Sequence, residues 1–130
     1  MTHGSESIEE QRPLSKEEYE LSKWLLLHSG KDTEGYLQQL ENATVSGKCP
    51  CGCASVDFSV SGKKANYSAG LEVLSEYLWR DESGNLMGIF VFAHENRLSG
   101  LEVWSVDGEK TPSTLPASED LVSFEEVRNA

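Results

Sequence analysis

The spacing of apolar residues changes after Asn42, and this change constrains the fold more than any other feature of the sequence. Before Asn42 apolar side chains recur at helical intervals, whereas after it they alternate with polar ones. The alternation is clearest over residues 54–61, where it is typical of a strand with one buried and one solvent-facing side. A chain that is helical first and extended afterwards predicts an α+β domain with helices packed on an antiparallel sheet.

Two helices are predicted at the beginning of the chain. Ser15 and Glu18 have the spacing of a capping box, in which each side chain bonds the backbone of the other residue. An apolar face follows from Leu21 to His28, and Gly30 supplies a stop. A shorter helix is predicted over residues 32–41, so that the sequence favours an N-terminal helix pair.

Residues 1–12 are polar and are predicted to form a disordered leader, while residues 13–130 form one α+β domain. The leader has no apolar run of the kind found in a secretory signal. No segment approaches the roughly 18 apolar residues of a membrane span. A cytoplasmic location is therefore expected, and reducing compartments disfavour structural disulfides.

Extended segments are predicted over residues 44–48, 54–61, 71–79, 86–93 and 98–106. Turn-forming residues separate the last three of these segments, which favours consecutive antiparallel pairing. The run at 86–93 is apolar almost throughout, as in a central strand that is covered on both faces. The expected sheet is an antiparallel meander of four or five strands, with the segment at 98–106 at an edge.

All three cysteines of the chain stand at alternate positions in the run Cys49-Pro50-Cys51-Gly52-Cys53. Thiolates bind zinc and other soft metals, and Pro50 and Gly52 favour the tight turn that three sulfurs would need to reach one ion. Zinc modules commonly use two ligand pairs, and a second pair is missing here. A fourth ligand would have to come from His28, His94 or a carboxylate.

Three other interpretations of the cysteine run stay open. The thiols can be small, partly buried side chains at a turn, as cysteines often are. A disulfide requires Cα atoms within about 7 Å, which alternate residues of an extended strand barely satisfy. A paired-cysteine redox centre typically has two residues between its cysteines, and this run has one.

The chain carries 22 acidic and 11 basic residues, for a formal net charge of -11. Such a charge repels nucleic acids, and no basic stripe offers a local exception. An acidic surface attracts basic protein partners. Trp104, beside Glu102 on the expected edge strand, is the predicted partner contact, and pairing across a sheet edge makes a homodimer a further expectation.

Familiar catalytic patterns are absent from the sequence. It contains no glycine-rich phosphate loop ending in Lys-Ser/Thr, no Gly-x-Ser-x-Gly elbow and no His-Glu-x-x-His pair. The sequence therefore favours a non-enzymatic acidic interaction module, of an inhibitor or immunity type, over an enzyme. The alternative is a zinc-binding or thiol-redox protein that uses Cys49, Cys51 and Cys53.

Two runs of the sequence resemble an uncharacterised family of small bacterial proteins. They are Cys-x-Cys-Gly-Cys-x-Ser-Val-x-Phe at residues 49–58 and Gly-Leu-Glu-Val-Trp-Ser-x-Asp-Gly at residues 100–108. The resemblance implies a stand-alone bacterial cytosolic domain and carries over no catalytic or ligand residue. In size and charge the chain is also similar to toxin-neutralising immunity proteins.

Overall fold

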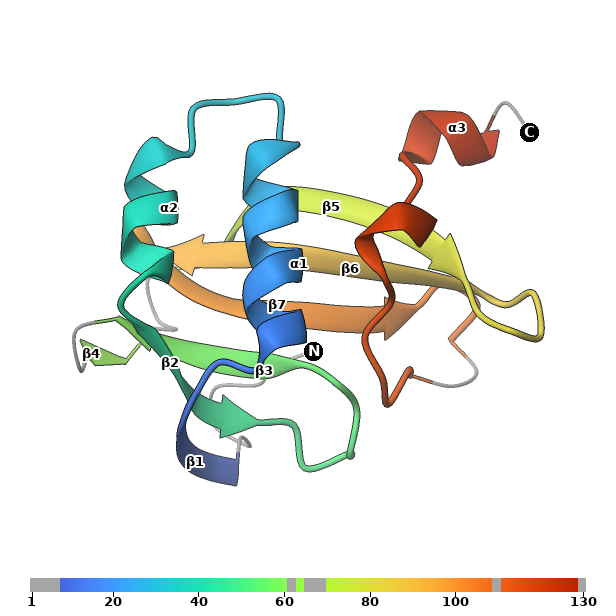
Figure 1. Cartoon of the computed structure of the whole chain (residues 1–130). Helices are drawn as coiled ribbons and strands as arrows, with labels where there is room; N and C mark the ends of the chain where they lie inside the picture. Colours follow the sequence, from blue (N-terminus) through green and yellow to red (C-terminus); the bar gives the residue numbers. More distant parts are fainter. Residues whose placement is uncertain (1–7, 61–62, 65–69, 109–110, 129–130) are drawn as a thin grey trace.

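The computed structural model describes residues 8–60, 63–64, 70–108 and 111–128 and has the predicted α+β architecture, with helices on an antiparallel sheet (Figure 1). The helices are α1 (Lys16–Leu27), α2 (Glu34–Leu40) and α3 (Phe124–Arg128), with a 3-10 turn at Ser118–Asp120. The strands are β1 (Ile8–Pro13), β2 (Ala43–Lys48), β3 (Val56–Val60), β4 (Lys63–Lys64), β5 (Glu72–Arg80), β6 (Leu86–His94) and β7 (Arg97–Ser105).

The sheet runs in the order β1-β2-β3-β7-β6-β5, and the two-residue strand β4 pairs with β3. All neighbouring strands are antiparallel. The main path therefore has six strands instead of the expected four or five. Strands β5, β6 and β7 form the predicted meander, but β7 then pairs with β3, and this long-range pairing joins the two halves of the sheet.

The prediction of a disordered leader through residue 12 is wrong for residues 8–12, which belong to β1 and pair with β2. Arg12 at the end of β1 donates two hydrogen bonds, of 2.8 and 2.9 Å, to the Glu18 carboxylate on α1. Burial opposes ionisation of Glu18, but the bonds from Arg12 and from the Ser15 backbone outweigh it and lower the pKa of Glu18. Residues 1–7 lie outside the described part of the chain.

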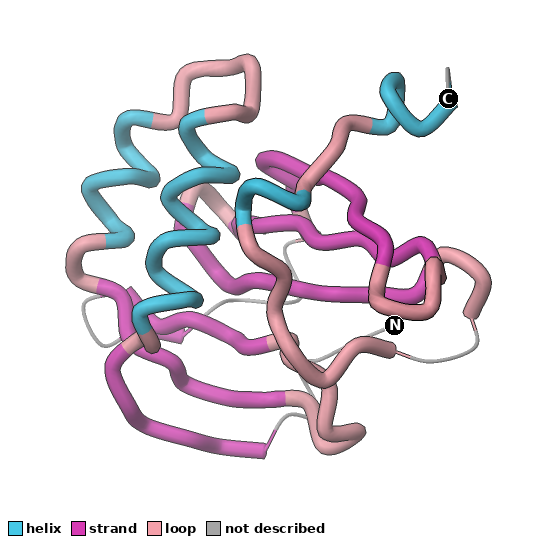
Figure 2. Tube along the Cα trace, turned by 45° about the vertical axis from the view of Figure 1, so that its right-hand side comes forward, coloured by secondary structure: helices cyan, strands magenta, loops and turns pink. Residues whose placement is uncertain are grey.

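The two N-terminal helices lie side by side over one face of the sheet (Figure 2). The predicted capping box is confirmed, since Ser15 Oγ accepts from the Glu18 N–H and Glu18 Oε1 accepts from the Ser15 N–H. Leu25 and Leu26 of α1 are fully buried in a core with strand residues such as Ile89 and Leu101. None of the described helices is long and apolar enough to cross a bilayer.

The opposite face of the sheet is less exposed than the alternation predicts. All five residues of β3 are buried, including Asp57 and Ser59, which were expected to face solvent. Phe92 on the central strand β6 is buried on the same side, where its ring lies against Gly100 of β7. On this second face of the sheet, polar side chains such as Asp57 are thus buried together with the Phe92 ring, and the Asp57 carboxyl is partly removed from water.

Candidate metal centre

The cysteine run forms the loop between β2 and β3. Gly52 has φ +86°, a conformation that glycine adopts readily, and its N–H donates to the Cys49 carbonyl over 3.2 Å. The chain therefore reverses within the cysteine run itself. The Ala54 N–H then donates to the Pro112 carbonyl over 3.0 Å, which ties the loop to the C-terminal part of the chain.

The reversal brings the three sulfurs together. The Sγ atoms of Cys49, Cys51 and Cys53 all lie within 4.8 Å of one another, and those of Cys49 and Cys51 are 2.6 Å apart. The Cys53 N–H donates to Cys51 Sγ over 3.3 Å. All three residues are free thiols. The cysteine triad, as we call these three residues, is thus convergent without a covalent link.

Burial differs among the members of the cysteine triad. Cys49 is buried, Cys53 is intermediate and Cys51 is exposed. Burial, together with a hydrogen bond to the Cys51 thiol, raises the pKa of Cys49 to about 12. Partial burial also opposes ionisation of Cys51, but hydrogen bonds from the other two thiols outweigh it and lower its pKa. Cys51 is therefore the thiol of this pair that loses its proton more readily, and it faces the solvent.

This donor set suits a soft cation. A tetrahedral zinc ion with Zn–S bonds of about 2.3 Å holds its sulfurs about 3.8 Å apart. The 4.8 Å limit of the cysteine triad is compatible with that size, while Cys49 and Cys51 must separate from their 2.6 Å distance by side-chain rotation. Three protein ligands leave a fourth position for water or for a ligand from a partner.

The structure does not bring the candidate fourth ligands to the cysteine triad. His94 lies at the end of β6, where its Nδ1 contacts the Gly70 carbonyl and its ring packs edge-on against Phe92. That end of β6 and the β2–β3 loop are at opposite ends of the sheet (Figure 1). His28 is exposed after α1, and its ring stacks on Trp24 at 3.9 Å. Within the described residues, the metal-compatible group consists of the three cysteines.

The prediction that Glu102 and Trp104 lie on an edge strand is wrong. Their strand, β7, lies between β3 and β6 inside the sheet. Glu102 is 9% exposed, and Trp104 is half-buried and donates from Nε1 to Glu76 Oε2 over 3.0 Å. Burial raises the pKa of Glu102 to about 7, and the negative charge of Asp57 contributes in the same direction. Burial also raises the pKa of Glu76, although the bond from Trp104 opposes that change.

Sequence reasoning missed that Glu102 and Asp57 are buried. Two glycines within strands offered a signal, because a glycine in a strand often marks a close approach of another group. A Cβ atom added at Gly88 would collide with the Trp104 ring, and one added at Gly100 would lie 2.6 Å from both the Phe92 ring and the Val56 carbonyl oxygen. Both glycines thus make room for rings on the second face.

No family model matches the chain, and neither a curated protein nor a solved structure matches it. The resemblance to a family of small bacterial proteins therefore stays a prediction.

Proposed function

We propose that this protein binds one soft metal ion, foremost Zn²⁺, through Cys49, Cys51 and Cys53. The observation that carries the proposal is the convergence of the three Sγ atoms within 4.8 Å. A short loop with a glycine turn holds them in place, so the cost of ordering three ligands is largely met by folding.

The order of deprotonation also supports metal entry from the solvent side. Cys51 is exposed and has a lowered pKa, so its thiolate is the first available ligand of the Cys49–Cys51 pair. Cys49 has a pKa of about 12 and releases its proton only to a strongly bound cation. Metal binding is therefore coupled to proton release, and affinity rises with pH.

The alternative is thiol-redox chemistry, which the 2.6 Å distance between the sulfurs of Cys49 and Cys51 favours. In that reaction the Cys51 thiolate attacks a disulfide of a partner protein and Cys49 resolves the mixed disulfide. The pair gives up two protons and two electrons, and the partner's disulfide becomes two thiols. The exchange leaves a Cys49–Cys51 disulfide, which thiol counting detects.

The test is zinc titration of tag-free, reduced protein against a chromophoric chelator, with elemental analysis of protein purified without chelating agents. We expect one zinc ion per chain and complete loss of tight binding in the variant Cys49→Ser/Cys51→Ser/Cys53→Ser. His28→Gln is the matched control, because it removes an exposed potential ligand outside the cysteine triad. It should leave the stoichiometry unchanged.

Zinc binding that survives the triple replacement would contradict the proposal. So would protein that takes up no zinc while all three thiols are reduced. If thiol counting after treatment with a disulfide-containing peptide instead shows the loss of two thiols per chain, and zinc is not bound, the redox alternative replaces the metal site.

A further inference from the structure

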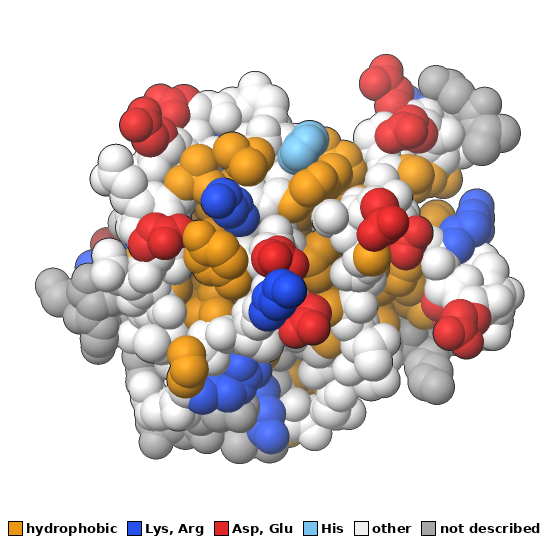
Figure 3. Space-filling view, viewed as in Figure 1, with side chains coloured by type: hydrophobic (Ala, Val, Ile, Leu, Met, Phe, Trp, Pro, Cys, Tyr) orange, Lys and Arg blue, Asp and Glu red, His pale blue; other side chains and the backbone are white. Residues whose placement is uncertain are grey.

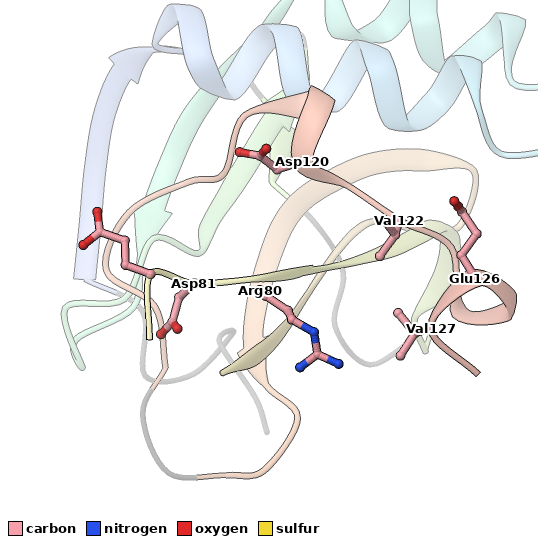
Figure 4. A pocket seen from close by; sticks show the side chains of 7 residues that line it. Arg80, Asp81, Asp120, Val122, Glu126 and Val127 are labelled. Carbon is pink, nitrogen blue, oxygen red and sulfur yellow. The ribbon is translucent and has the colours of Figure 1, made fainter. Parts of the chain in front are cut away.

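A groove lies where the end of β5 meets the C-terminal segment. A hollow of about 490 Å³ is lined by residues that include Arg80 and Asp81 from β5 and its turn. The opposite wall comes from the C-terminal segment, with Asp120, Val122, Glu126 and Val127 (Figure 4). A second hollow of about 510 Å³ continues along residues 112–117 and shares Arg80, Asp81, Glu82 and Asp120 with the first. We call the two hollows together the β5 groove.

The walls of the β5 groove are acidic. Its first hollow has four carboxylates and one guanidinium, and that guanidinium is engaged, because Arg80 Nη1 donates to the Gly84 carbonyl over 3.1 Å. Asp81 is also engaged, since its carboxylate accepts from Ser83 and Asn85 in the turn. On the right of the space-filling view, acidic side chains lie beside apolar ones, with basic side chain atoms among them (Figure 3).

Three carboxylates of the β5 groove are available to a ligand. Glu82 and Asp120 are exposed, and their carboxylates make no hydrogen bond or ion pair with any described residue. Glu126 uses Oε1 to accept from the Ser123 N–H over 2.9 Å and keeps its second oxygen for another partner. Between these acids, Val122 and Val127 supply apolar surface.

The backbone of β5 adds a second recognition element. Among the described residues β5 is the last strand of the sheet, and its outer edge pairs with the C-terminal segment at one bridge, between Leu78 and Val122, with bonds of 2.9 and 2.8 Å. Backbone groups of every second residue in a strand point to the same edge. The N–H and C=O of Arg80 therefore face the same edge as those of Leu78, at the wall of the β5 groove.

We propose that the β5 groove binds an extended basic segment of a partner protein, in which cationic residues alternate with apolar ones. The cations pair with Glu82, Asp120 and Glu126, and the apolar side chains contact Val122 and Val127. Main-chain hydrogen bonds to the edge of β5 fix the segment in extended form. Charge complementarity selects this occupant: the chain carries a net charge of -11, so a second copy is repelled and a basic segment is attracted. The proposal is independent of the metal site.

The probe is a fluorescein-labelled peptide of alternating lysine and valine, titrated with the full chain and followed by fluorescence anisotropy at an ionic strength of about 0.1 M, where the Debye length is about 10 Å. The groove variant is Glu82→Gln/Asp120→Asn/Glu126→Gln. The matched control is Glu17→Gln/Glu20→Gln/Glu34→Gln, which removes the same charge from exposed positions on α1 and α2. Loss of three charge contacts should weaken binding about tenfold in the groove variant. The control should change affinity less than about twofold, since its residues do not line the β5 groove and salt screens charges that make no direct contact with the peptide.

Two further peptides test the charge and the apolar parts. A peptide with glutamate in place of lysine should not bind, and one with serine in place of valine should bind more weakly than the original. Equal weakening by the two triple variants would overturn the proposal, because binding would then follow net charge alone. Equal affinity for the serine and valine peptides, or no binding of the lysine–valine peptide, would overturn it as well.

Discussion

The cysteine loop and the second face of the sheet both hold a titratable group whose pKa is raised by burial. In the loop this group is Cys49, with a pKa of about 12, and on the second face it is Glu102, with a pKa of about 7. They differ in their neighbours. Cys49 has two further thiols beside it, one of them exposed, whereas Glu102 lies inside the sheet near a second buried acid. Burial alone therefore does not identify a binding site. The cysteine loop is a candidate because several ligand atoms of the same kind converge there and one of them is open to solvent, whereas Glu102 is a buried side chain within the sheet.

The largest expected effect concerns Glu102. The carboxyl has a pKa of about 7 in the folded state, against an ordinary pKa of 4.5, so the native state binds the proton more tightly than the unfolded state. Proton binding by Glu102 therefore contributes fully to the free energy of unfolding below about pH 4.5, and this contribution is lost as the pH rises through 7. The variant Glu102→Gln should therefore be more stable than the wild type at pH 8, by up to about 3 kcal/mol.

Urea unfolding at pH 5 and pH 8 measures this difference, and the variant should gain little at pH 5. Equal effects at both pH values would show that Glu102 titrates normally. The second face would then resemble an ordinary solvated surface.

Zinc should raise the free energy of unfolding by about 2.7 kcal/mol when free zinc is about 100 times Kd. The triple Cys→Ser variant should show no gain, and Glu102→Gln should keep the full gain.

Because at least the Cys49 proton is released on zinc binding, the affinity for zinc should fall at least about a hundredfold from pH 8 to pH 6. Zinc titrations at the two pH values check this dependence, and a pH-independent affinity would argue against thiolate ligands.

Gly100→Ala tests whether the second face is tightly packed. The new Cβ would lie 2.6 Å from the Val56 backbone oxygen, which cannot move without disturbing β3. We expect a loss of about 2 kcal/mol in urea unfolding. Gly35→Ala is the control: no atom lies within 4 Å of its Cβ position, and alanine favours helix α2, so stability should rise by up to about 1 kcal/mol. Similar effects at the two sites would contradict tight packing around Gly100.

The smallest expected effect belongs to Trp104. Trp104→Phe removes the Nε1 donor from the half-buried Glu76 carboxylate, which should cost about 1 kcal/mol and raise the pKa of Glu76 further. The cost should therefore be greater at pH 8 than at pH 4. Trp24→Phe removes an indole that stacks on His28 instead, and its effect should not depend on the ionisation of Glu76. Identical pH profiles for the two variants would remove the role assigned to the Trp104 bond.

The parts of the fold that depend on local sequence were predictable. Ser15 and Glu18 define the start of α1 within four residues, and the alternation after Asn42 located β3. The parts that depend on distant pairing were not. Strand β1 forms because residues 8–13 pair with β2, and β7 is internal because it pairs with β3 across more than forty residues of chain.

The candidate sites follow the same division. The cysteine triad lies within five consecutive residues, so its chemistry was visible in the sequence, and a single turn at Gly52 brings the sulfurs together. The β5 groove combines the end of β5 with a segment about forty residues later, and no spacing rule connects Glu82 with Glu126. The sequence does not reveal the order of the strands, so Glu102 was predicted to lie on an edge strand. Long-range pairing instead places β7 inside the sheet, where Glu102 is buried.

X-ray absorption at the zinc edge tests the central claim most directly. If the cysteine triad holds the ion, the zinc-loaded protein will show three sulfur neighbours at about 2.3 Å and one lighter ligand at about 2.0 Å. A first shell made only of nitrogen and oxygen would place the metal elsewhere on the chain and contradict the account.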